Sequence, residues 1–194
     1  MSPRRRDRPL TREELLDAAL TIVDSEGLAA LTMQHLADAV GVEAMSLYHH
    51  VPSKAVLLDW TVDRIRSEMR LPELAPDDWA DAMEAVFVEY RRVLTAHPNL
   101  LPLSARRTDP SVPSGLTYLI DHGIPAEDAV ELYQSLVAFT VGYSMLGSAV
   151  LETAWTGLPH ELAERLRDWR DGTFRRTLRI VLDGYRAEQG EETS

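Results

Sequence analysis

Apolar residues recur every three or four positions along most of the chain, and no segment alternates apolar and polar residues as a half-buried strand does. This pattern predicts an all-α protein. The first helix is expected to begin after Thr11, because Thr11 and Glu14 have the spacing of a capping box, in which each side chain satisfies a backbone N–H of the other residue. It is expected to end at Gly27, since glycine commonly terminates a helix.

Three more helices are predicted in the first third of the chain. Thr32 is a favourable N-cap for a short helix that reaches about Val40, and Gly41 ends it. A second short helix is expected over residues 43–50. A longer helix is expected from residue 53, with a serine as its cap, to residue 69.

A connector with two prolines, residues 71–76, precedes the next predicted helix. Asp77 is expected to cap that helix, which reaches about Ala96. Four prolines lie between residues 97 and 114, and they predict a loop with at most a short helix, because proline breaks a helix interior.

Helices dominate the remaining sequence as well. One is expected over residues 114–121, and the longest is expected from Pro125 to about residue 153, because proline is favoured in the first turn of a helix. Residues 160–190 predict one helix, or two helices broken near Gly172. The polar tail, residues 188–194, is expected to fray.

Residues 33–52 form the most informative pattern. The small Ala37 allows two short helices to pass close together, Gly41 can take the left-handed conformation of a tight turn, and Leu47 anchors the second helix. If these residues face inward, the side chains that face outward or lie at the edge are Glu43, Ala44, Met45, Ser46, His49 and His50. A helix with such a face fits the DNA major groove. Two short core helices of an ordinary bundle are the alternative interpretation.

The formal net charge is −11, from 20 basic and 31 acidic residues, which excludes a protein that binds nucleic acid through bulk positive charge. A local basic patch is compatible with it. Arg4, Arg5, Arg6 and Arg8 form an N-terminal arm of the kind that reaches phosphates or the minor groove, with a solubilising terminus as the alternative. Lys54, the only lysine, lies at the start of a predicted helix, where backbone N–H groups also favour a phosphate.

No pattern of catalytic or metal-binding residues is recognisable. The chain has no cysteine, and none of its six histidines forms a metal-binding pair on one helix face. Because no glycine-rich phosphate loop or nucleophile elbow is present either, we expect no catalytic residue, no metal and no cofactor, with an enzyme of an all-helical class as the alternative. The absence of a long apolar run and of a signal peptide predicts a cytoplasmic protein with no membrane partner.

Residues 32–54 resemble the N-terminal segment of the tetracycline-repressor (TetR) family of transcriptional regulators. The resemblance rests on Gly-Leu-x-x-Leu-Thr at 27–32, Gly-Val at 41–42, Leu-Tyr-x-His-Val at 47–51 and Lys54. Two later stretches, Gly-Ile-Pro-Ala-Glu-Asp-Ala-Val at 123–130 and Phe-Thr-Val-Gly at 139–142, resemble the tetracycline-repressor-like C-terminal domain.

The resemblance implies an all-helical homodimer that is usually a repressor. Its N-terminal helix-turn-helix domain, residues 1–58, would bind a palindromic operator in double-stranded DNA. A connecting helix end and linker, residues 59–71, would join it to a larger ligand-binding and dimerisation domain, residues 72–194.

Carried over position by position, the resemblance implies base contacts by Gln34, Ala44, Met45 and Ser46 and phosphate contacts by Thr32, Tyr48, His50 and Lys54. We add His49 and the arm residues Arg4, Arg5 and Arg6 to the predicted interface. Tetracycline repressor carries polar residues at the positions of Ala44 and Met45 and an arginine at that of Gln34, so the DNA target must differ. Residues 100–107 lack the histidine with which that repressor binds magnesium–tetracycline, which argues against tetracycline as the effector.

Large apolar residues of the second part are predicted to line an effector cavity between the fifth, seventh and eighth helices, with simple core packing as the alternative. They are Met83, Phe87, Tyr90, Leu116, Tyr133, Leu136, Phe139 and Tyr143. An apolar stripe on the last helix is predicted to form the dimer interface, with packing inside the subunit as the alternative. It comprises Phe174, Leu178, Val181, Leu182 and Tyr185.

Together these patterns predict a sequence-specific transcriptional regulator, a repressor that a small apolar or aromatic effector releases from its operator. The alternative is a helical ligand-binding protein or enzyme that does not bind DNA.

Overall fold

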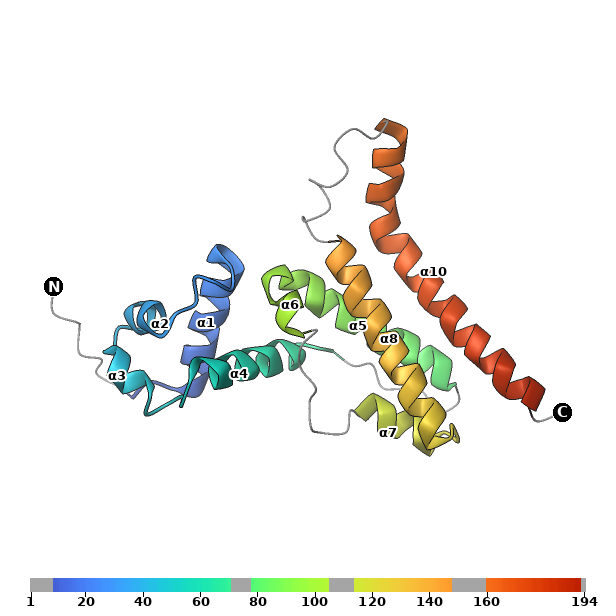
Figure 1. Ribbon diagram of the computed structural model, residues 1–194, viewed down its shortest axis with the longest axis horizontal. Coiled ribbons are helices and arrows are strands. Elements are labelled where there is room, and N and C mark those ends of the chain that lie inside the picture. Colours follow the sequence, from blue (N-terminus) through green and yellow to red (C-terminus); the bar gives the residue numbers. More distant parts are fainter. Residues whose placement is uncertain (1–8, 71–77, 105–113, 148–159, 193–194) are drawn as a thin grey trace. The chain divides into compact units, whose positions relative to one another are not determined.

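A computed structural model describes residues 9–70, 78–104, 114–147 and 160–192, and every regular element within these ranges is a helix (Figure 1). The all-α prediction is therefore confirmed. The chain divides into two compact units. Unit 1 comprises the described residues up to Glu68 together with residues 97–104, and unit 2 comprises residues 69–96 and the described residues from 114 onward.

Unit 1 is built around the first helix, α1. Its elements are α1 (Arg12–Glu26), α2 (Met33–Val40), α3 (Ala44–Leu47), α4 (Lys54–Arg66), the 3-10 helix η1 (Pro98–Leu100) and α6 (Leu101–Ser104). Helix α1 packs against α2, α4 and η1, and α2 packs against α3. The domain prediction placed residues 97–104 in the C-terminal domain, whereas in the structure they pack with the N-terminal helices.

The N-caps predicted for the first two helices are present. The Glu14 N–H donates to Thr11 Oγ1 (3.2 Å) and the Thr11 N–H donates to Glu14 Oε2 (3.1 Å), which completes the capping box. Thr32 caps α2 by accepting from the His35 N–H (3.0 Å). Ser53 caps α4 in the same way, three positions before the donor. These bonds explain why the helices begin where the sequence predicts.

The core of unit 1 consists of apolar side chains at the positions that the periodicity predicts to face inward. Ala19 and Val23 of α1 and Leu36 of α2 are fully buried, and so is Leu57 of α4. Burying a side chain of the size of leucine stabilises the fold by about 1.5–3 kcal/mol. The short N-terminal helices are therefore stabilised by packing against one another rather than by their own helix propensity.

Two helices of unit 1 are shorter than predicted. Helix α3 ends at Leu47 rather than at His50, because the N–H groups of His50 and Val51 both bond to the Leu47 carbonyl (2.8 Å each) and turn the chain. Helix α4 ends at Arg66 rather than near residue 69, where the Ser67 hydroxyl donates to a backbone carbonyl of the last turn (2.6 Å). The predicted loop after residue 97 contains the short elements η1 and α6.

Unit 2 is a bundle of longer helices. They are α5 (Trp79–Ala96), α7 (Ser114–Asp121), α8 (Ala126–Gly147) and α10 (His160–Glu192). Helix α5 packs against α7, α8 and α10, and α8 packs against α7 and α10 (Figure 1). Their common core includes Met83 and Phe87 of α5, Leu136 of α8, and Phe174 and Leu178 of α10.

Three details of unit 2 differ from the prediction. The cap of α5 is Asp78, whose Oδ1 accepts from the Ala80 N–H (2.9 Å), and Asp77 lies outside the described residues. Helix α8 is described to Gly147, so its predicted extension to residue 153 lies outside the described part. Helix α10 is continuous through Gly172 and reaches Glu192, so the one-helix alternative is confirmed and the helix extends into the predicted polar tail. A glycine inside a helix costs only about 1 kcal/mol, less than α10 gains by packing.

Ion pairs connect α5 to α10. Arg179 donates to the Asp81 carboxylate, and Arg186 donates to Asp78. Burial raises the pKa of the Asp78 carboxyl. Hydrogen bonds from the Ala80 N–H and from Arg186 outweigh this effect and lower the pKa below its ordinary value. Such exposed pairs contribute about 0.2–1 kcal/mol each, so they set the register of α10 more than they stabilise it.

Candidate DNA-binding interface and effector-binding region

The turn between α2 and α3 has the geometry that the sequence predicts for a helix-turn-helix. Gly41 adopts φ 71° and ψ 39°, the left-handed conformation that glycine takes most readily. The Val42 N–H then bonds back to the Ala37 carbonyl (3.0 Å). Ala37 is fully buried, which agrees with its predicted role at the close approach of the two helices.

Helix α3 is anchored on one side and open on the other. Leu47 and the following Val51 are fully buried, whereas Met45 is 75% exposed and Tyr48 is 48% exposed. The other predicted DNA-facing side chains of this segment are also exposed or half-buried, namely Ala44, Ser46, His49 and His50. These side chains are therefore accessible to a partner.

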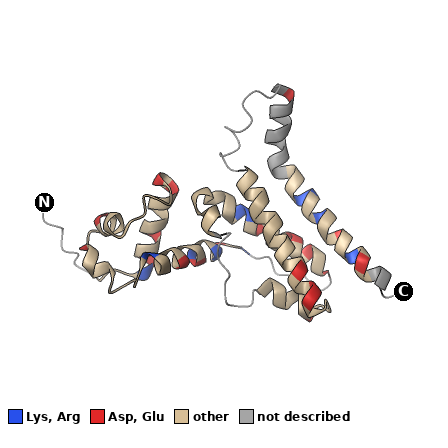
Figure 2. Cartoon of the chain, viewed as in Figure 1, with Lys and Arg blue, Asp and Glu red and all other residues tan. Residues whose placement is uncertain are grey.

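The four residues of α3 are neither basic nor acidic (Figure 2), and the exposed Glu43 precedes them as the N-cap. Nearby, Gln34 is exposed and its side-chain amide donates to Asp38 Oδ1 (3.0 Å), which orients it across α2. Lys54 is half-buried at the first position of α4 and forms no ion pair with a described residue. The arm residues Arg4, Arg5 and Arg6 lie outside the described residues.

Sequence reasoning missed Arg12. Its guanidinium carbon lies 3.9 Å from the centroid of the Trp60 ring, so α1 and α4 are joined by a cation–π contact. The two residues are far apart in the sequence, and neither belongs to a motif. Only the packing of α1 on α4 reveals the pair.

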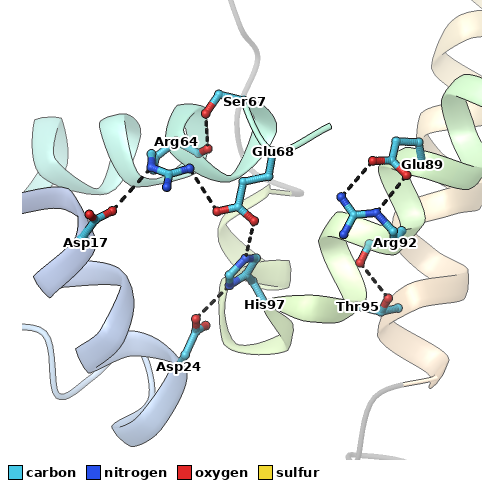
Figure 3. A network of polar contacts seen from close by, with 9 residues as sticks. All are labelled: Asp17, Asp24, Arg64, Ser67, Glu68, Glu89, Arg92, Thr95 and His97. Atoms are coloured by element: carbon cyan, nitrogen blue, oxygen red, sulfur yellow. Dashed lines mark hydrogen bonds and ion pairs between the residues drawn. The ribbon is translucent and has the colours of Figure 1, made fainter. Parts of the chain in front are cut away.

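Sequence reasoning also missed a polar network within unit 1 (Figure 3). The buried His97 ring lies between Asp24 of α1 and Glu68, which follows α4. Arg64 contacts both Glu68 (3.1 Å) and Asp17 (3.6 Å). These five residues come from three separate segments, so no local sequence pattern indicates them.

The predicted effector-binding residues fall into two groups. Met83, Phe87, Leu136 and Tyr143 are at most 5% exposed and belong to the core of unit 2. Tyr90, Leu116, Tyr133 and Phe139 are half-buried and pack against that core. The second group is the one with surface left to contact a ligand.

Aromatic rings join α5, α8 and α10 in this region. Phe87 contacts Tyr133 edge to face, with ring centroids 5.6 Å apart, and Phe139 stacks on Phe174 at 5.3 Å. A Cβ at Gly115 would lie 2.8 Å from the Tyr133 ring, so this glycine lets α7 approach α8 closely. The Arg91 guanidinium lies 5.0 Å from the Phe174 ring centroid and was not predicted.

The predicted dimer stripe needs a correction. Phe174, Leu178 and Leu182 are at most 2% exposed and pack in the chain's own core, and Val181 and Tyr185 pack against that core. Side chains already enclosed by α5 and α8 have little surface left for a partner, so the alternative of packing inside the subunit describes these residues. The outward face of α10 carries Ile180, which is 60% exposed.

Histidines elsewhere have local structural contacts. His35 Nδ1 lies 3.1 Å from the Ala30 carbonyl, and the His122 ring stacks on Tyr118. Among the described residues, no three His, Asp or Glu side chains are grouped to hold a metal ion. None of the helices in the same ranges is both long and apolar enough to cross a membrane.

Two family models match the chain in succession. Residues 15–59 match the model described as bacterial regulatory proteins, tetR family. Residues 71–168 match the tetracyclin repressor-like, C-terminal domain.

Individual proteins give the same result. An HTH-type transcriptional regulator of Saccharopolyspora erythraea is 38% identical over 98 residues, which are 50% of this chain and 42% of that protein. The HTH-type transcriptional repressor DrrR1 of Streptomyces coeruleorubidus is 33% identical over 148 residues, covering 72% of this chain and 55% of the repressor. The matches thus span about half the length of these two relatives.

Among solved structures, the TetR family protein ActR of Streptomyces coelicolor in complex with actinorhodin has a TM-score of 0.74 and 27% identity, over 94% of this chain and 100% of that one. A solved protein of this family thus has a similar fold over its whole length. Because the two models match the helix-turn-helix and most of the helical bundle in turn, the chain belongs to the TetR family of bacterial regulatory proteins and has a tetracycline repressor-like C-terminal domain.

Proposed function

We propose that this chain is a sequence-specific DNA-binding transcriptional regulator, a repressor that a small molecule releases from a palindromic operator. The outward surface of α3 carries the proposal. Leu47 fixes the helix from below, while Met45 and Tyr48 leave large apolar surfaces in water. Exposed apolar groups beside polar ones are typical of a surface that binds a partner. The major groove offers such a surface both thymine methyl groups and polar base edges.

In this proposal, base contacts come from Gln34, Ala44, Met45 and Ser46, and phosphate contacts come from Thr32, Tyr48, His49, His50, Lys54 and the arginine-rich arm. The strongly acidic chain gives no general attraction to DNA. Affinity must therefore depend on these few contacts, and it should fall steeply as salt rises.

The decisive experiment is selection of bound sequences from random duplex DNA. We expect a palindrome whose half-sites are about one helical turn apart, or a multiple of it. A Met45→Ala/Tyr48→Ala variant should bind the selected duplex at least about tenfold more weakly, since each specific contact is worth about 1–3 kcal/mol. Ile120→Ala, which removes an exposed apolar side chain of α7 in unit 2, is the matched control.

Equal affinity for all duplexes, or no enriched sequence, would contradict the proposal. It would favour the alternative of a helical ligand-binding protein or enzyme that does not bind DNA. As a DNA-binding regulator the protein would act in the cytoplasm, and we propose no catalytic activity, metal or cofactor for it.

We propose further that unit 2 binds an apolar or aromatic effector. The half-buried Tyr90, Leu116, Tyr133 and Phe139 would contact it, and Met83, Phe87, Leu136 and Tyr143 would support them from the core. Two observations support this assignment. The aromatic rings of three helices converge on one region of unit 2, and the relative ActR binds actinorhodin.

Thermal melting with a panel of polycyclic aromatic compounds, actinorhodin included, tests the effector. Phe87→Ala should cost about 3–5 kcal/mol of stability, as expected for a core residue. Phe139→Ala should cost less and should remove the melting shift caused by a bound compound. Loss of that melting shift on adding a chelator would contradict a metal-free site. An unchanged shift in Phe139→Ala would show that Phe139 is a core residue and not a ligand contact.

We propose, finally, that the protein is a homodimer and that the outward face of α10 forms part of its interface. Thr177, Ile180, Gly184 and Ala187 follow one another at three- and four-residue spacing on this helix. None of them is fully buried in the chain. Small and apolar residues at this spacing allow two helices to pack closely, and a two-fold axis would bring the same face of each subunit together.

A further inference from the structure

His97 occupies a distinctive place in the chain. Residues 97–104 follow α5 of unit 2, yet they belong to unit 1, where η1 packs against α1. His97 is the first residue of this segment, and its side chain is only 11% exposed. The segment is attached to α1 a second time by Asn99, whose side-chain amide donates to the Val23 carbonyl (2.9 Å). The contacts of His97 therefore contribute, with those of Asn99, to holding residues 97–104 on the DNA-binding helices.

Both ring nitrogens of His97 face carboxylates. Nδ1 lies 2.8 Å from Asp24 Oδ2, and Nε2 lies 3.3 Å from Glu68 Oε2 (Figure 3). An ionised carboxylate only accepts hydrogen bonds, so each ring nitrogen must carry a proton for both bonds to form. A neutral imidazole has one N–H and can make one of them. The imidazolium makes both, and both are then charge-assisted.

The side chains that surround His97 are mostly acidic. Asp24 and Asp17 of α1 and Glu68 are carboxylates, and Arg64 of α4 lies between Asp17 and Glu68. In the described part of unit 1, the charged partners in this network are thus three carboxylates and one guanidinium. The His97 ring is largely buried between two of these carboxylates, so its hydrogen bonds are shielded from water.

We propose that His97 is a proton-dependent clasp that fixes residues 97–104 on α1 and on the end of α4. In its charged form it joins the two helices that support the helix-turn-helix, and the recognition surface is held ready for DNA. As pH rises and the proton is lost, one of the two bonds is lost with it, the segment loosens, and operator affinity falls. Histidine is the side chain that ordinarily changes charge between about pH 5 and 8.

The clasp is tested first without DNA, on the full-length protein. Ring nitrogen chemical shifts of His97 report its charge, and amide exchange corrected for the intrinsic pH dependence reports how firmly residues 98–104 are held. We expect protection of this segment to fall by about fivefold or more between pH 5.5 and 8, at the lower end of typical couplings between sites. His97→Gln should remove this pH dependence, because an amide does not titrate in that range.

Two further variants keep the result interpretable. Asp24→Asn leaves the histidine in place, and it should reduce the pH dependence, because an amide can bond to Nδ1 whether or not that nitrogen carries a proton. His122→Gln changes a half-buried histidine of unit 2 and should leave the dependence unchanged. Protection that is independent of pH in the parent protein, or that varies equally in His97→Gln, would overturn the clasp.

The link to regulation rests on the proposed DNA-binding function and is measured with the duplex obtained by selection. At constant salt, the parent protein should lose affinity from pH 5.5 to 8 by about fivefold more than His97→Gln does. A His49→Gln/His50→Gln background removes the histidines of the recognition surface. In that background, the same difference in the pH dependence of affinity should be found between His97 and His97→Gln. Failure to select any duplex would contradict the proposed function and leave the DNA-free result standing. Specific binding with the same pH profile in His97→Gln would overturn the regulatory role.

Discussion

Gly41 shows how one residue determines the helix-turn-helix. Its left-handed conformation costs a residue with a Cβ roughly 1–2 kcal/mol, and no neighbouring atom lies within 4 Å of the place where a Cβ would be added. A substitution there therefore tests backbone conformation without a steric clash. We expect Gly41→Ala to lower the free energy of unfolding by about 1–2 kcal/mol and Gly41→Asn to lower it less, since asparagine tolerates this conformation.

Chemical unfolding followed by circular dichroism measures both changes. Gly172→Ala is the matched control, because Gly172 is helical, lacks a positive φ and also has open space around it. Alanine should stabilise α10 there by up to about 1 kcal/mol. An equal loss for alanine and asparagine at Gly41 would show that the conformation of this residue is not the cause.

Lys54 is predicted to act through charge alone. It is the first residue of α4 and follows the exposed Tyr48 and His50 closely in the sequence. A phosphate contact carries no base information. Lys54→Ala should therefore weaken binding equally across duplex sequences and flatten the dependence of affinity on salt by about one unit of slope.

Fluorescence anisotropy over a salt series measures this slope. Arg66→Ala is the control, because Arg66 lies at the other end of α4 and pairs with Asp63 (4.0 Å). A Lys54→Ala variant that alters base preference while keeping the parental salt slope would assign Lys54 to base recognition instead.

At the scale of single elements, the sequence predicts helix starts better than helix ends. Thr11, Thr32 and Ser53 all cap the helices expected of them, because an N-cap depends on one side chain and a backbone N–H three residues away. Helix ends depend on partners that are distant in sequence. Helix α10 continues through Gly172 because its apolar face packs on α5 and α8, which no local pattern reveals.

The start of α5 allows a test of charge at the element scale. Asp78 caps the helix and also accepts from Arg186 of α10, and these bonds lower its pKa below the ordinary value of 3.8. A lowered carboxyl pKa stabilises the fold above the ordinary value, and that contribution is lost as pH falls through the lowered pKa. The effect of Asp78 should therefore be full at pH 7 and lower at pH 3.

Two substitutions separate the cap from the ion pair. Asp78→Asn keeps a good N-cap and removes the charge, whereas Asp78→Ala removes both and should cost about 0.5–2 kcal/mol at pH 7. Thermal melting at pH 7 and pH 3 measures the difference from the parent. If Asp78→Asn is as destabilising at pH 3 as at pH 7, the ion pair is not the source of its effect.

At the scale of the whole molecule, exposed functional residues were easier to predict than buried ones. The exposure of Met45 follows from the pattern because the inward Leu47 leaves it outside, whereas Tyr48 was indicated by the family resemblance. An apolar stripe does not tell which neighbour covers it. Leu178 and Leu182 fit a dimer interface and a subunit core equally well in sequence, and only the packing of α10 on α5 and α8 decides between them. The clasp at His97 depends on contacts between distant segments and has no sequence pattern at all.

The same distinction leads to a test of the proposed dimer. Ile180 is 60% exposed on α10, beside the small Gly184, whereas the stripe next to it is buried. In a two-fold interface, a glutamate at position 180 would face the same residue of the second subunit or lie buried close to it. Ile180→Glu would therefore introduce two unpaired charges into a closed interface, and their desolvation should shift the protein to monomer.

Analytical ultracentrifugation at micromolar concentration measures the shift, and Ile120→Glu is the control, since it adds the same charge at an exposed apolar position of α7. Because a palindromic operator needs two recognition helices at fixed spacing, the Ile180→Glu monomer should lose most of its affinity for the full operator and keep its weak affinity for a half-site. An Ile180→Glu variant that stays dimeric would move the interface away from this face of α10. A monomer that still binds the full operator as tightly as the parent would separate dimerisation from DNA recognition.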